Sequence, residues 1–403
     1  MSENKRSVFA QKTLSLESVS RGRILGAAES AQDHNIDAAS ILVDLGMDTE
    51  TIIAALIRPL PDMALDTFGA SAAFLVRELK KIDSLKTATK TVYEAQNIRN
   101  MIFTLACDIR VILIKLAEKL AALRVLHLQD ERKTTARECL DIYAPIADRL
   151  GISWIKNEME DISLKFLNSE AYQQIKKLVA EKREQRARFL EYAQKILRQE
   201  AEAAGIEVEV ESRAKHFYSV YMKMRKRGIS AEKIYDLSAI RIICGSIENC
   251  YTLLGIVHRL WKPLNGCFKD YIAMPKPNGY QSLHTSVTTG KEPDEEEKTL
   301  EVQIRTKEMH QIAEHGVASH WLYKKGSSRD MVLPEDMGVV NKLKNWKQSL
   351  DGAGEFSPAW LDGIKNEILR KWIYVFTPQG KVIKLPTGAT PLDFAYHIHT
   401  AVG

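Results

Sequence analysis

The hydrophobic periodicity of the chain changes once, near Gly205, and this change limits the folds that the chain can adopt. Before it, residues 15–200 place apolar side chains at helical spacing almost throughout, as in the leucine- and isoleucine-rich stretch 109–126. After it, valines alternate with glutamates over 207–211, which is the period of a strand with one polar face. The sequence therefore predicts an all-helical N-terminal part followed by a mixed α/β part.

Charge and helix-breaking residues indicate the boundaries between these parts. Residues 176–204 are highly charged and hold no breaker, so we expect one long connecting helix that Gly205 ends. Pro59 and Pro61 should end or bend a helix earlier in the chain. The expected organisation is a helical domain over 1–175, the connecting helix over 176–204, an α/β domain over 205–340, a linker over 341–371 and a partial domain over 372–403.

The α/β domain should contain one short helix and several strands. We expect the helix over 216–227, strands over 238–244, 283–288 and 299–305, an acidic loop over 291–298 and a mixed connector over 326–370. From Trp372, two further strands should flank the turn signal at 378–380.

Composition excludes several classes of protein. The 403 residues suffice for two or three domains, and no apolar run reaches the roughly 18 residues of a membrane span. The N-terminus lacks an apolar signal-peptide core. The cysteines form no Cys-x-x-Cys pair, which argues against a zinc ribbon or a disulfide framework and favours a reducing, cytoplasmic setting.

Charge and polar side chains concentrate in the α/β part. Residues 205–290 carry a net charge of +5, which suits a nucleotide or a nucleic acid but also an ordinary solvated face. In the strand LEVQIRT at 300–306, Glu301, Gln303 and Arg305 share one face. Asp236 lies directly before the predicted strand at 238–244. Carboxylates beside a basic cleft suit a Mg²⁺–triphosphate site, although strand carboxylates are more often plain surface residues.

The segment GCFKDYIAMPKPNGYQSLHTSVT at 266–288 places polar groups and an aromatic ring around Gly and Pro breakers. Loop-borne groups of this kind suggest base stacking beside phosphate contacts. Tyr280 by itself would equally suit a packed loop aromatic, and the cluster KMRKR at 223–227 would equally suit a solvated helix end or an RNA contact.

Taken together, five blocks in order resemble the synthetase domain of the RelA/SpoT family. They are RAKHFYSVYMKM at 213–224, IYDLSAIRI at 234–242, FKDYIAMPKPNGYQSLHT at 268–285, EVQIRT at 301–306 and HQIAEHGVASHW at 310–321. The resemblance implies a nucleotidyltransferase-like fold with a mixed sheet flanked by helices. It also implies transfer of pyrophosphate from ATP to the 3′-OH of GDP or GTP, which makes (p)ppGpp in the stringent response.

The resemblance assigns roles to individual residues. Asp236 would bind Mg²⁺, and Glu301 would be the second essential carboxylate, near the acceptor 3′-OH as metal ligand or base. Tyr280 would stack on the guanine of the acceptor. The residues that would bind ATP are Arg213, Lys215, Ser219, Lys223 and Arg241, and those that would line the acceptor and the transferred group are Lys269, Asn278, His284, Gln303 and Arg305.

One block departs from the family. Before Asp-Tyr, dual-function members carry Arg-x-Lys-Asp and synthetase-only members carry Glu-x-Asp-Asp, whereas this chain reads Cys267-Phe268-Lys269-Asp270. The departure leaves the preferred metal and the choice between GDP and GTP open.

Residues 22–128 resemble the HD-type hydrolase domain that usually precedes this synthetase. That domain removes the 3′-pyrophosphate with a metal held by two separated His, a His-Asp pair and a later Asp. Here the His-Asp position reads Arg58-Pro59, the later Asp is Glu118, and only His34 stands where a ligand is expected. We therefore expect a pseudo-hydrolase domain without a metal site, kept as an allosteric or packing partner.

Residues 374–403 resemble the opening of a TGS domain, a small β-grasp module, and we expect the chain to stop inside it. In relatives the following region contacts the ribosome and uncharged tRNA, which are the partners we expect. His397 and His399 stand near the position that relatives use to contact the tRNA 3′ end. The expected fold class is thus an all-helical HD-like domain, a mixed α/β synthetase domain and the start of a β-grasp domain.

Three functions remain open at this point. The first is an active pyrophosphokinase, which the presence of Asp236, Glu301 and Tyr280 favours. The second is a catalytically weak regulator that binds nucleotide or RNA. The third is a dual-function synthetase and hydrolase, which Arg58-Pro59 argues against.

Overall fold

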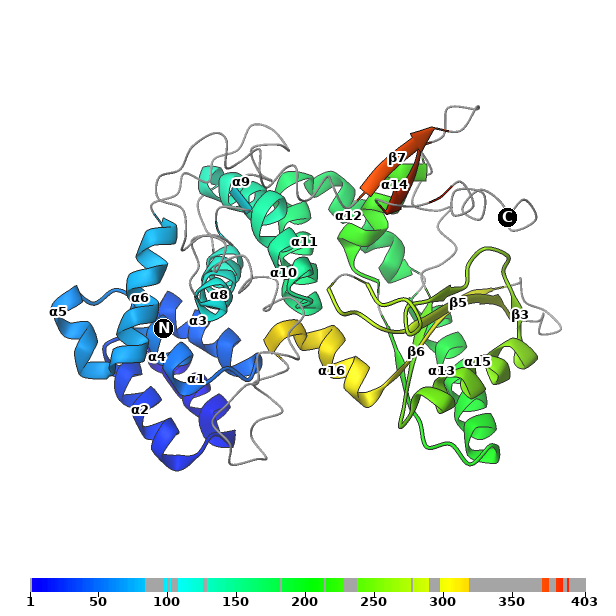
Figure 1. Ribbon diagram of the computed structural model, residues 1–403, viewed down its shortest axis with the longest axis horizontal. Coiled ribbons are helices and arrows are strands. Elements are labelled where there is room, and N and C mark those ends of the chain that lie inside the picture. The colour runs from blue at the N-terminus through cyan, green and yellow to red at the C-terminus, as the bar shows by residue number, and fades with distance from the viewer. Residues whose placement is uncertain are drawn as a thin grey trace. The chain divides into compact units, whose positions relative to one another are not determined.

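The computed structural model in Figure 1 forms two compact units, Met1–Val332 and Leu333–Gly403. The residues that it describes are 2–83, 98–99, 102, 108–125, 129–181, 183–213, 215–227, 238–276, 278–289, 298–318, 372–376, 382–386 and 390.

The first unit begins with a group of helices packed around α4 and α8. Most side chains of α4 are buried, and so is the continuous run 111–117 of α8. Asp48 begins α4 by accepting a hydrogen bond from Thr51 N over 3.0 Å, and α4 ends at Ile57, before the predicted break at Pro59. The helices are α1 Ser2–Lys12, α2 Ser18–Glu29, α3 Asp33–Asp44, α4 Thr49–Ile57, α5 Asp62–Leu65, α6 Ala70–Asp83, α8 Ile109–Val125 and α9 Gln129–Glu138.

A sharp turn then joins two helices that reach the α/β part. A π-helical turn at Cys139–Tyr143 leads into α10, Ala144–Arg149, and α11 follows at Ser153–Leu167. Gly151 lies in the turn with a φ of 77°, a conformation that glycine adopts at little cost. The neighbouring Leu150 carbonyl accepts a hydrogen bond from Val317 N of the α/β part over 3.0 Å.

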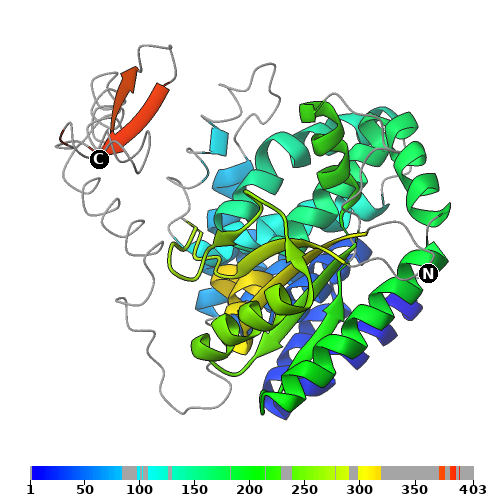
Figure 2. The same ribbon diagram turned by 90° about the vertical axis from the view of Figure 1, so that its right-hand side faces the viewer.

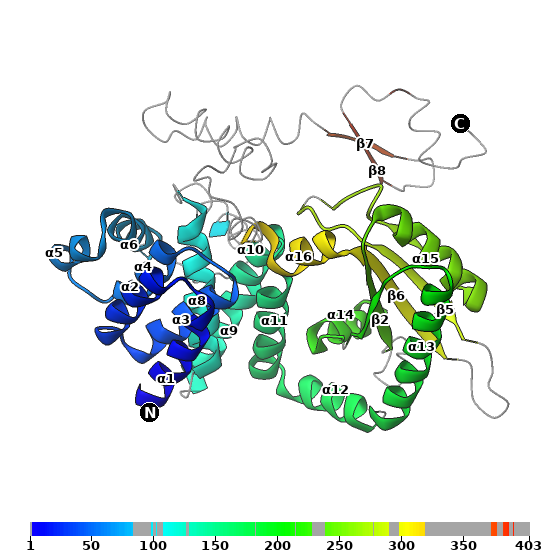
Figure 3. The same cartoon turned by 90° about the horizontal axis from the view of Figure 1, so that it is seen from below.

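The predicted connecting helix over 176–204 is two helices. The structure has α12 at Ser169–Glu181 and α13 at Arg183–Ala203, which meet at an angle in Figure 3. The cause is tertiary, because α12 packs through Ile175 against α14, Phe217–Arg227, whereas α13 packs against the sheet. Gly205 ends α13 as predicted, with a φ of 70° and a hydrogen bond from its N–H to Glu202 O.

The α/β part contains a mixed sheet of six strands in the order β1-β2-β6-β5-β3, with β4 also paired to β5. Strand β2 runs parallel to β6, and the other pairs are antiparallel. The strands are β1 Glu209–Ser212, β2 Ala239–Cys244, β3 Lys262–Pro263, β4 Lys269–Asp270, β5 Leu283–Thr288 and β6 Thr299–Thr306. The predicted strands at 207–211, 238–244, 283–288 and 299–305 and the predicted helix at 216–227 are confirmed to within two residues.

The two faces of the sheet differ in chemistry. Helices α13 and α15, Ile247–Leu260, lie side by side on one face in Figures 2 and 3, and their apolar side chains form the core with Leu300, Val302 and Ile304 of β6. The opposite face carries the polar side chains of β6, as the alternation predicts, and α16, Lys307–His315, follows β6 directly. The fold class predicted for this unit, helical and then mixed α/β, is confirmed.

In the second unit the described strands are β7, Trp372–Phe376, and β8, Val382–Pro386, which pair antiparallel as predicted. The connector at 326–370, the linker at 341–371 and the acidic loop apart from Lys298 lie outside the described residues. Among the helices that the structure describes, none has the length and apolar character needed to cross a bilayer.

Candidate functional site

The centre of the candidate site is Glu301 on the polar face of β6. Its carboxylate contacts Lys215 Nζ over 2.7 Å and accepts a hydrogen bond from Gln303 Nε2 over 3.0 Å. Burial raises the pKa of Glu301, but Lys215 and Gln303 lower it more strongly, so that the pKa falls to about 2. Glu301 is therefore ionised at neutral pH.

Gln303 lies beside Glu301 with 1% of its surface exposed. Its amide nitrogen binds Glu301, while its Oε1 has no hydrogen-bond partner within the described ranges. A buried carbonyl oxygen without a partner is costly, so this atom is available to a donor or cation that enters the site.

Two arginines from adjacent strands share one carboxylate. Arg241 of β2 lies next to Gln303 in the parallel register, and Arg305 follows on β6. Glu314 of α16 contacts Arg241 Nη2 over 3.2 Å and Arg305 Nη2 over 3.0 Å, and Arg305 also contacts His310 Nδ1 over 2.8 Å. Burial and the nearby Arg241 lower the pKa of Arg305, as expected for two guanidinium groups held close together.

The loop before β5 brings aromatic rings to the same region. The Tyr280 hydroxyl and His284 Nε2 form a hydrogen bond of 2.8 Å. The Tyr271 and Tyr280 rings pack edge to face with centroids 6.1 Å apart. Lys276 Nζ lies 4.9 Å from the centre of the Tyr280 ring. Burial lowers the pKa of His284 to about 4, and Arg213, Lys276 and Lys269 lower it further against the opposing effect of Glu301. His284 is therefore neutral at pH 7.

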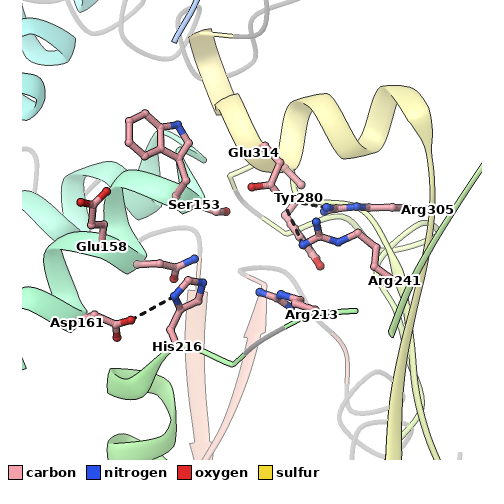
Figure 4. Close-up of a pocket in the computed structure, with 12 residues that line it drawn as sticks. Ser153, Glu158, Asp161, Arg213, His216, Arg241, Tyr280, Arg305 and Glu314 are labelled. Atoms are coloured by element: carbon pink, nitrogen blue, oxygen red, sulfur yellow. Dashed lines mark hydrogen bonds and ion pairs between the residues drawn. The ribbon is translucent and has the colours of Figure 1, made fainter. Parts of the chain in front are cut away.

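These side chains surround a pocket of about 430 Å³, shown in Figure 4. Arg213, Arg241, Arg305 and Tyr280 form its α/β side, and the figure shows the three guanidinium groups on one side of the space. The opposite wall is α11, which no sequence motif indicated as part of the site. The lining residues of that wall and of the rim are Ser153, Trp154, Asn157, Glu158, Asp161, His216, Ala313 and Glu314.

The structure brings most of the predicted site residues together, but not all of them. Arg213, Arg241, Tyr280 and Arg305 line one pocket. Lys215, Glu301, Gln303 and His284 are linked through Glu301 beside it. Asp236 lies outside the described residues.

The other predicted residues lie at the margin of this arrangement. Lys269 is exposed on β4 opposite His284, and α14 presents an exposed Ser219 and a half-buried Lys223. The Asn278 amide donates to the Asp148 carbonyl of α10 over 2.9 Å, so in this structure it ties the Tyr280 loop to the helical part. The roles predicted for these four side chains remain predictions, as do those of the residues that the structure brings together.

The missed residues differ in how far the sequence could have indicated them. His216 and Glu314 lie inside the blocks that carry the family resemblance, so those blocks were a usable signal. The residues of α11 lie outside every block, and no local pattern marks them.

The helical domain has a charge cluster where the hydrolase ligands were expected. Arg58 forms ion pairs with Asp83 and with Glu118, whose Oε1 lies 2.6 Å from Arg58 Nε. Lys115 also contacts Asp83 and Glu118. Burial raises the pKa of Glu118 despite both cations. His34 is exposed on α3, and within the described ranges no three His, Cys, Asp or Glu side chains are grouped as metal ligands would be.

Three segments of the chain match known families. Residues 212–328 match the family described as a region found in RelA / SpoT proteins, residues 13–153 match the HD domain family, and residues 373–403 match the TGS domain family. Each match falls where the corresponding resemblance was recognised in the sequence.

Curated relatives carry two different names. The chain is 42% identical over 383 residues to the guanosine-3′,5′-bis(diphosphate) 3′-pyrophosphohydrolase of Aquifex aeolicus, covering 92% of this chain and 53% of the relative. It is 39% identical over 397 residues to the GTP pyrophosphokinase of Myxococcus xanthus, covering 96% and 51%, and 41% identical over 386 residues to that of Escherichia coli, covering 91% and 51%. The chain thus spans about half the length of these relatives.

Similar solved structures include two enzymes from Bacillus subtilis. Small alarmone synthetase 1, bound to its product pppGpp, is 21% identical with a TM-score of 0.30, covering 49% of this chain and 98% of that one. Small alarmone synthetase 2 is 27% identical with a TM-score of 0.28, covering 46% and 99%.

Proposed function

The chain belongs to the RelA/SpoT family, and from this premise we propose that it transfers the β,γ-pyrophosphate of ATP to the 3′-OH of GDP or GTP, which makes (p)ppGpp. The observation that carries the proposal is the pocket in which Arg213, Arg241, Arg305 and Tyr280 meet. It combines guanidinium groups for phosphates with an aromatic ring for a base.

The chemistry of the pocket suits phosphoryl-type transfer. Such a reaction asks the protein for positioning and for cations that stabilise charge on the transferred group, and little covalent chemistry. Arg213 and Arg241 would hold ATP through its phosphates and adenine face, with Lys215, Ser219 and Lys223 from the same side. Arg305, Lys269 and Gln303 would line the acceptor and the transferred group, where the positive charge of Arg305 would stabilise the phosphates.

The acceptor would lie against Tyr280. Its ring belongs to the pocket lining, its hydroxyl is already engaged with His284, and Lys276 lies over one ring face, so the other face of the ring is left for a guanine. Asn278 and His284 would then act on the acceptor side by holding this loop and ring.

Mg²⁺ fits the oxygen donors of the site. Glu301 is held ionised, and Gln303 Oε1 is a buried oxygen without a partner among the described residues. Glu301 and Asp236 would hold the ion, and Glu301 would also lie near the acceptor hydroxyl as ligand or base. When bound, Mg²⁺ would neutralise charge on the triphosphate.

A second part of the proposal is that the helical domain does not hydrolyse ppGpp. The ion pairs of Arg58 and Lys115 with Asp83 and Glu118 support it, because two cations already neutralise the carboxylates there. The alternative is a dual-function enzyme, which the hydrolase name of the Aquifex aeolicus relative favours. The two readings differ in a directly measurable activity.

The match of residues 373–403 to the TGS family supports a wider proposal. A longer form of the chain would contact the ribosome and uncharged tRNA through the region beyond this match, in the cytoplasm. Sedimentation of that longer form with ribosomes, with and without uncharged tRNA, tests it.

The main test is a time course with purified protein, Mg²⁺, labelled ATP and either GDP or GTP. We expect a 3′-pyrophosphorylated guanine nucleotide, and the ratio of rates measures the acceptor preference that Cys267 leaves open. Asp236→Asn should lower turnover at least about 100-fold, the scale of removing one electrostatic stabiliser. Absence of product with both acceptors, or wild-type rates in Asp236→Asn, would contradict the proposal.

A further inference from the structure

Asp161 of α11 contacts the start of α14 at the edge of the pocket. Its Oδ1 accepts a hydrogen bond from the Tyr218 backbone N–H over 2.8 Å, and its Oδ2 lies 3.4 Å from His216 Nδ1. Figure 4 shows the Asp161–His216 contact at the edge of the pocket that both residues line.

These contacts place Asp161 where the cap of α14 would normally be. The His216 carbonyl accepts the first helical hydrogen bond, from Val220 N over 3.2 Å, so His216 is the N-cap residue. Histidine is not among the side chains preferred at that position, which are Ser, Thr, Asp and Asn. The carboxylate that satisfies the first turn comes from α11, more than fifty residues earlier in the chain.

The segment held in this way carries the proposed donor-side residues. Lys215, directly before His216, contacts Glu301 over 2.7 Å, and Arg213 lines the pocket. Ser219 and Lys223 lie on α14 itself. A shift of the α14 N-terminus would therefore move the side chains that are proposed to bind ATP. The Tyr280 loop is held by a different contact, the hydrogen bond from Asn278 to the Asp148 carbonyl.

We infer that Asp161 is a positioning residue for the donor nucleotide: this residue of α11, which lies between the segments that match the HD and synthetase families, supplies the cap that fixes the ATP-binding side of the pocket. The inference rests on the proposed function and adds to it a residue that touches no substrate. It also implies that ATP binding requires α11 to be packed correctly against the start of α14.

The test compares steady-state kinetics of Asp161→Ala and Asp161→Asn. Loss of an N-cap acceptor corresponds to a change of about 2- to 30-fold in an equilibrium. Asp161→Ala should raise KM for ATP by this factor and leave KM for GDP unchanged. Asp161→Asn keeps an oxygen for the Tyr218 N–H and should stay within about 2-fold of wild type.

A cap supplied from within α14 gives a sharper test. His216→Ser places a preferred cap at the N-cap position, so the double variant Asp161→Ala/His216→Ser should recover most of the ATP affinity. Ile155→Val, which shortens a buried side chain of α11, controls for stability, and Glu170→Ala, an exposed carboxylate in the first turn of α12, controls for charge. Both should keep the wild-type KM for ATP.

Several outcomes would overturn the inference. These are an unchanged KM for ATP in Asp161→Ala, an equal rise in KM for ATP and GDP, or a double variant as impaired as Asp161→Ala. Binding of a non-hydrolysable ATP analogue, followed by calorimetry, separates this failure from that of the proposed function. If wild-type protein binds the analogue and forms product but Asp161→Ala binds it equally well, only the role of Asp161 is wrong.

Discussion

At the scale of single residues, Glu301 is an ionised carboxylate held by Lys215 and Gln303. A carboxyl whose pKa is lowered contributes stability above its unfolded pKa, near 4.5, and loses that contribution as the pH falls toward about 2. An acid limb of activity between pH 5 and 7 would therefore arise from another group.

Glu301→Gln tests the catalytic side of this arrangement. The substitution keeps the shape and removes the charge, so we expect turnover to fall at least about 100-fold while ATP affinity changes little. Rapid-quench turnover and calorimetric titration with an ATP analogue measure the two effects. A loss of ATP affinity as large as the loss of turnover would assign Glu301 to the ATP-binding side, to which its partner Lys215 belongs.

Tyr280 offers a test of the acceptor side. Stacking of a base on an aromatic ring is worth roughly 1–3 kcal/mol, so Tyr280→Ala should raise KM for GDP by about 5- to 150-fold. Tyr280→Phe keeps the ring but leaves His284 Nε2 without its partner, so its effect should be mild, near the roughly 1 kcal/mol of a neutral hydrogen bond. A Phe variant as impaired as the Ala variant would assign the function to the hydroxyl.

At the scale of elements, α11 carries a partly buried carboxyl group, Glu160, whose ionisation destabilises the fold. Burial raises the pKa of Glu160 to about 7, with Asp148 and Asp161 adding to the effect of burial and Lys156 opposing it. A group whose folded pKa is raised contributes stability below its unfolded pKa and loses it as the pH rises through the folded pKa. The protein should lose stability between about pH 4.5 and 7 for this reason.

Glu160→Gln should remove the loss of folding stability that ionisation of Glu160 causes at higher pH. The neutral amide cannot ionise, so the variant should be more stable than wild type by about 2–3 kcal/mol at pH 8 and by clearly less at pH 5. Urea unfolding at both pH values measures the difference. The exposed Glu170→Gln serves as control, and a variant less stable at pH 8 would contradict the raised pKa.

The junction between α16 and the α10–α11 turn is a second feature at this scale. Gly316 ends α16 with a φ of 54°, and Val317 N donates to Leu150 O over 3.0 Å. A Cβ atom added at Gly316 would lie 2.1 Å from Leu150 O, so the two backbones can approach only because residue 316 is glycine.

Gly316→Ala should force this junction apart. We expect a loss of at least about 3 kcal/mol in the free energy of unfolding, together with weaker activity, because Glu314 on the same helix holds Arg241 and Arg305. Gly266→Ala is the matched control, since Gly266 has a φ of 72° and open space around the added atom, and it should cost only about 1 kcal/mol. Equal effects of the two substitutions in thermal unfolding would show that close approach is unimportant.

At the scale of the whole molecule, the helical and α/β parts of the first unit share a site, because α11 forms one wall of the pocket and Asp148 holds the Tyr280 loop. A helical domain without hydrolase activity would thus still have a structural task. Whether that task is allosteric or one of packing, the two roles expected from the sequence, remains a prediction.

The hydrolase prediction belongs to this scale. Asp236→Asn protein incubated with ppGpp and Mn²⁺ should release no GDP and pyrophosphate above the no-protein control. Hydrolysis needs a bound metal to activate water, and Arg58 and Lys115 already pair with the carboxylates that would hold the metal. Arg58→His should not restore it, since Lys115 still neutralises Asp83 and Glu118. Steady release of GDP, with bound Mn²⁺ in parallel, would return the chain to the dual-function class.

The sequence by itself determined the local structure and the chemical groups of the site. Strand β6 was predicted with its polar and apolar faces, and Gly205 was predicted as the end of α13, because periodicity and helix-breaking residues act over a few neighbouring positions. The blocks between 213 and 321 indicated the family for the same reason, since each is a short run of residues.

Only the tertiary structure decided what faces those groups. The break between α12 and α13 arises because their apolar faces pack on different partners, α14 and the sheet, and no local signal records that choice. The contact of Asp161 with Tyr218 N likewise depends on how two helices far apart in the chain dock against each other. Docking is set by the summed burial of many side chains, so a single stretch of sequence carries no mark of it.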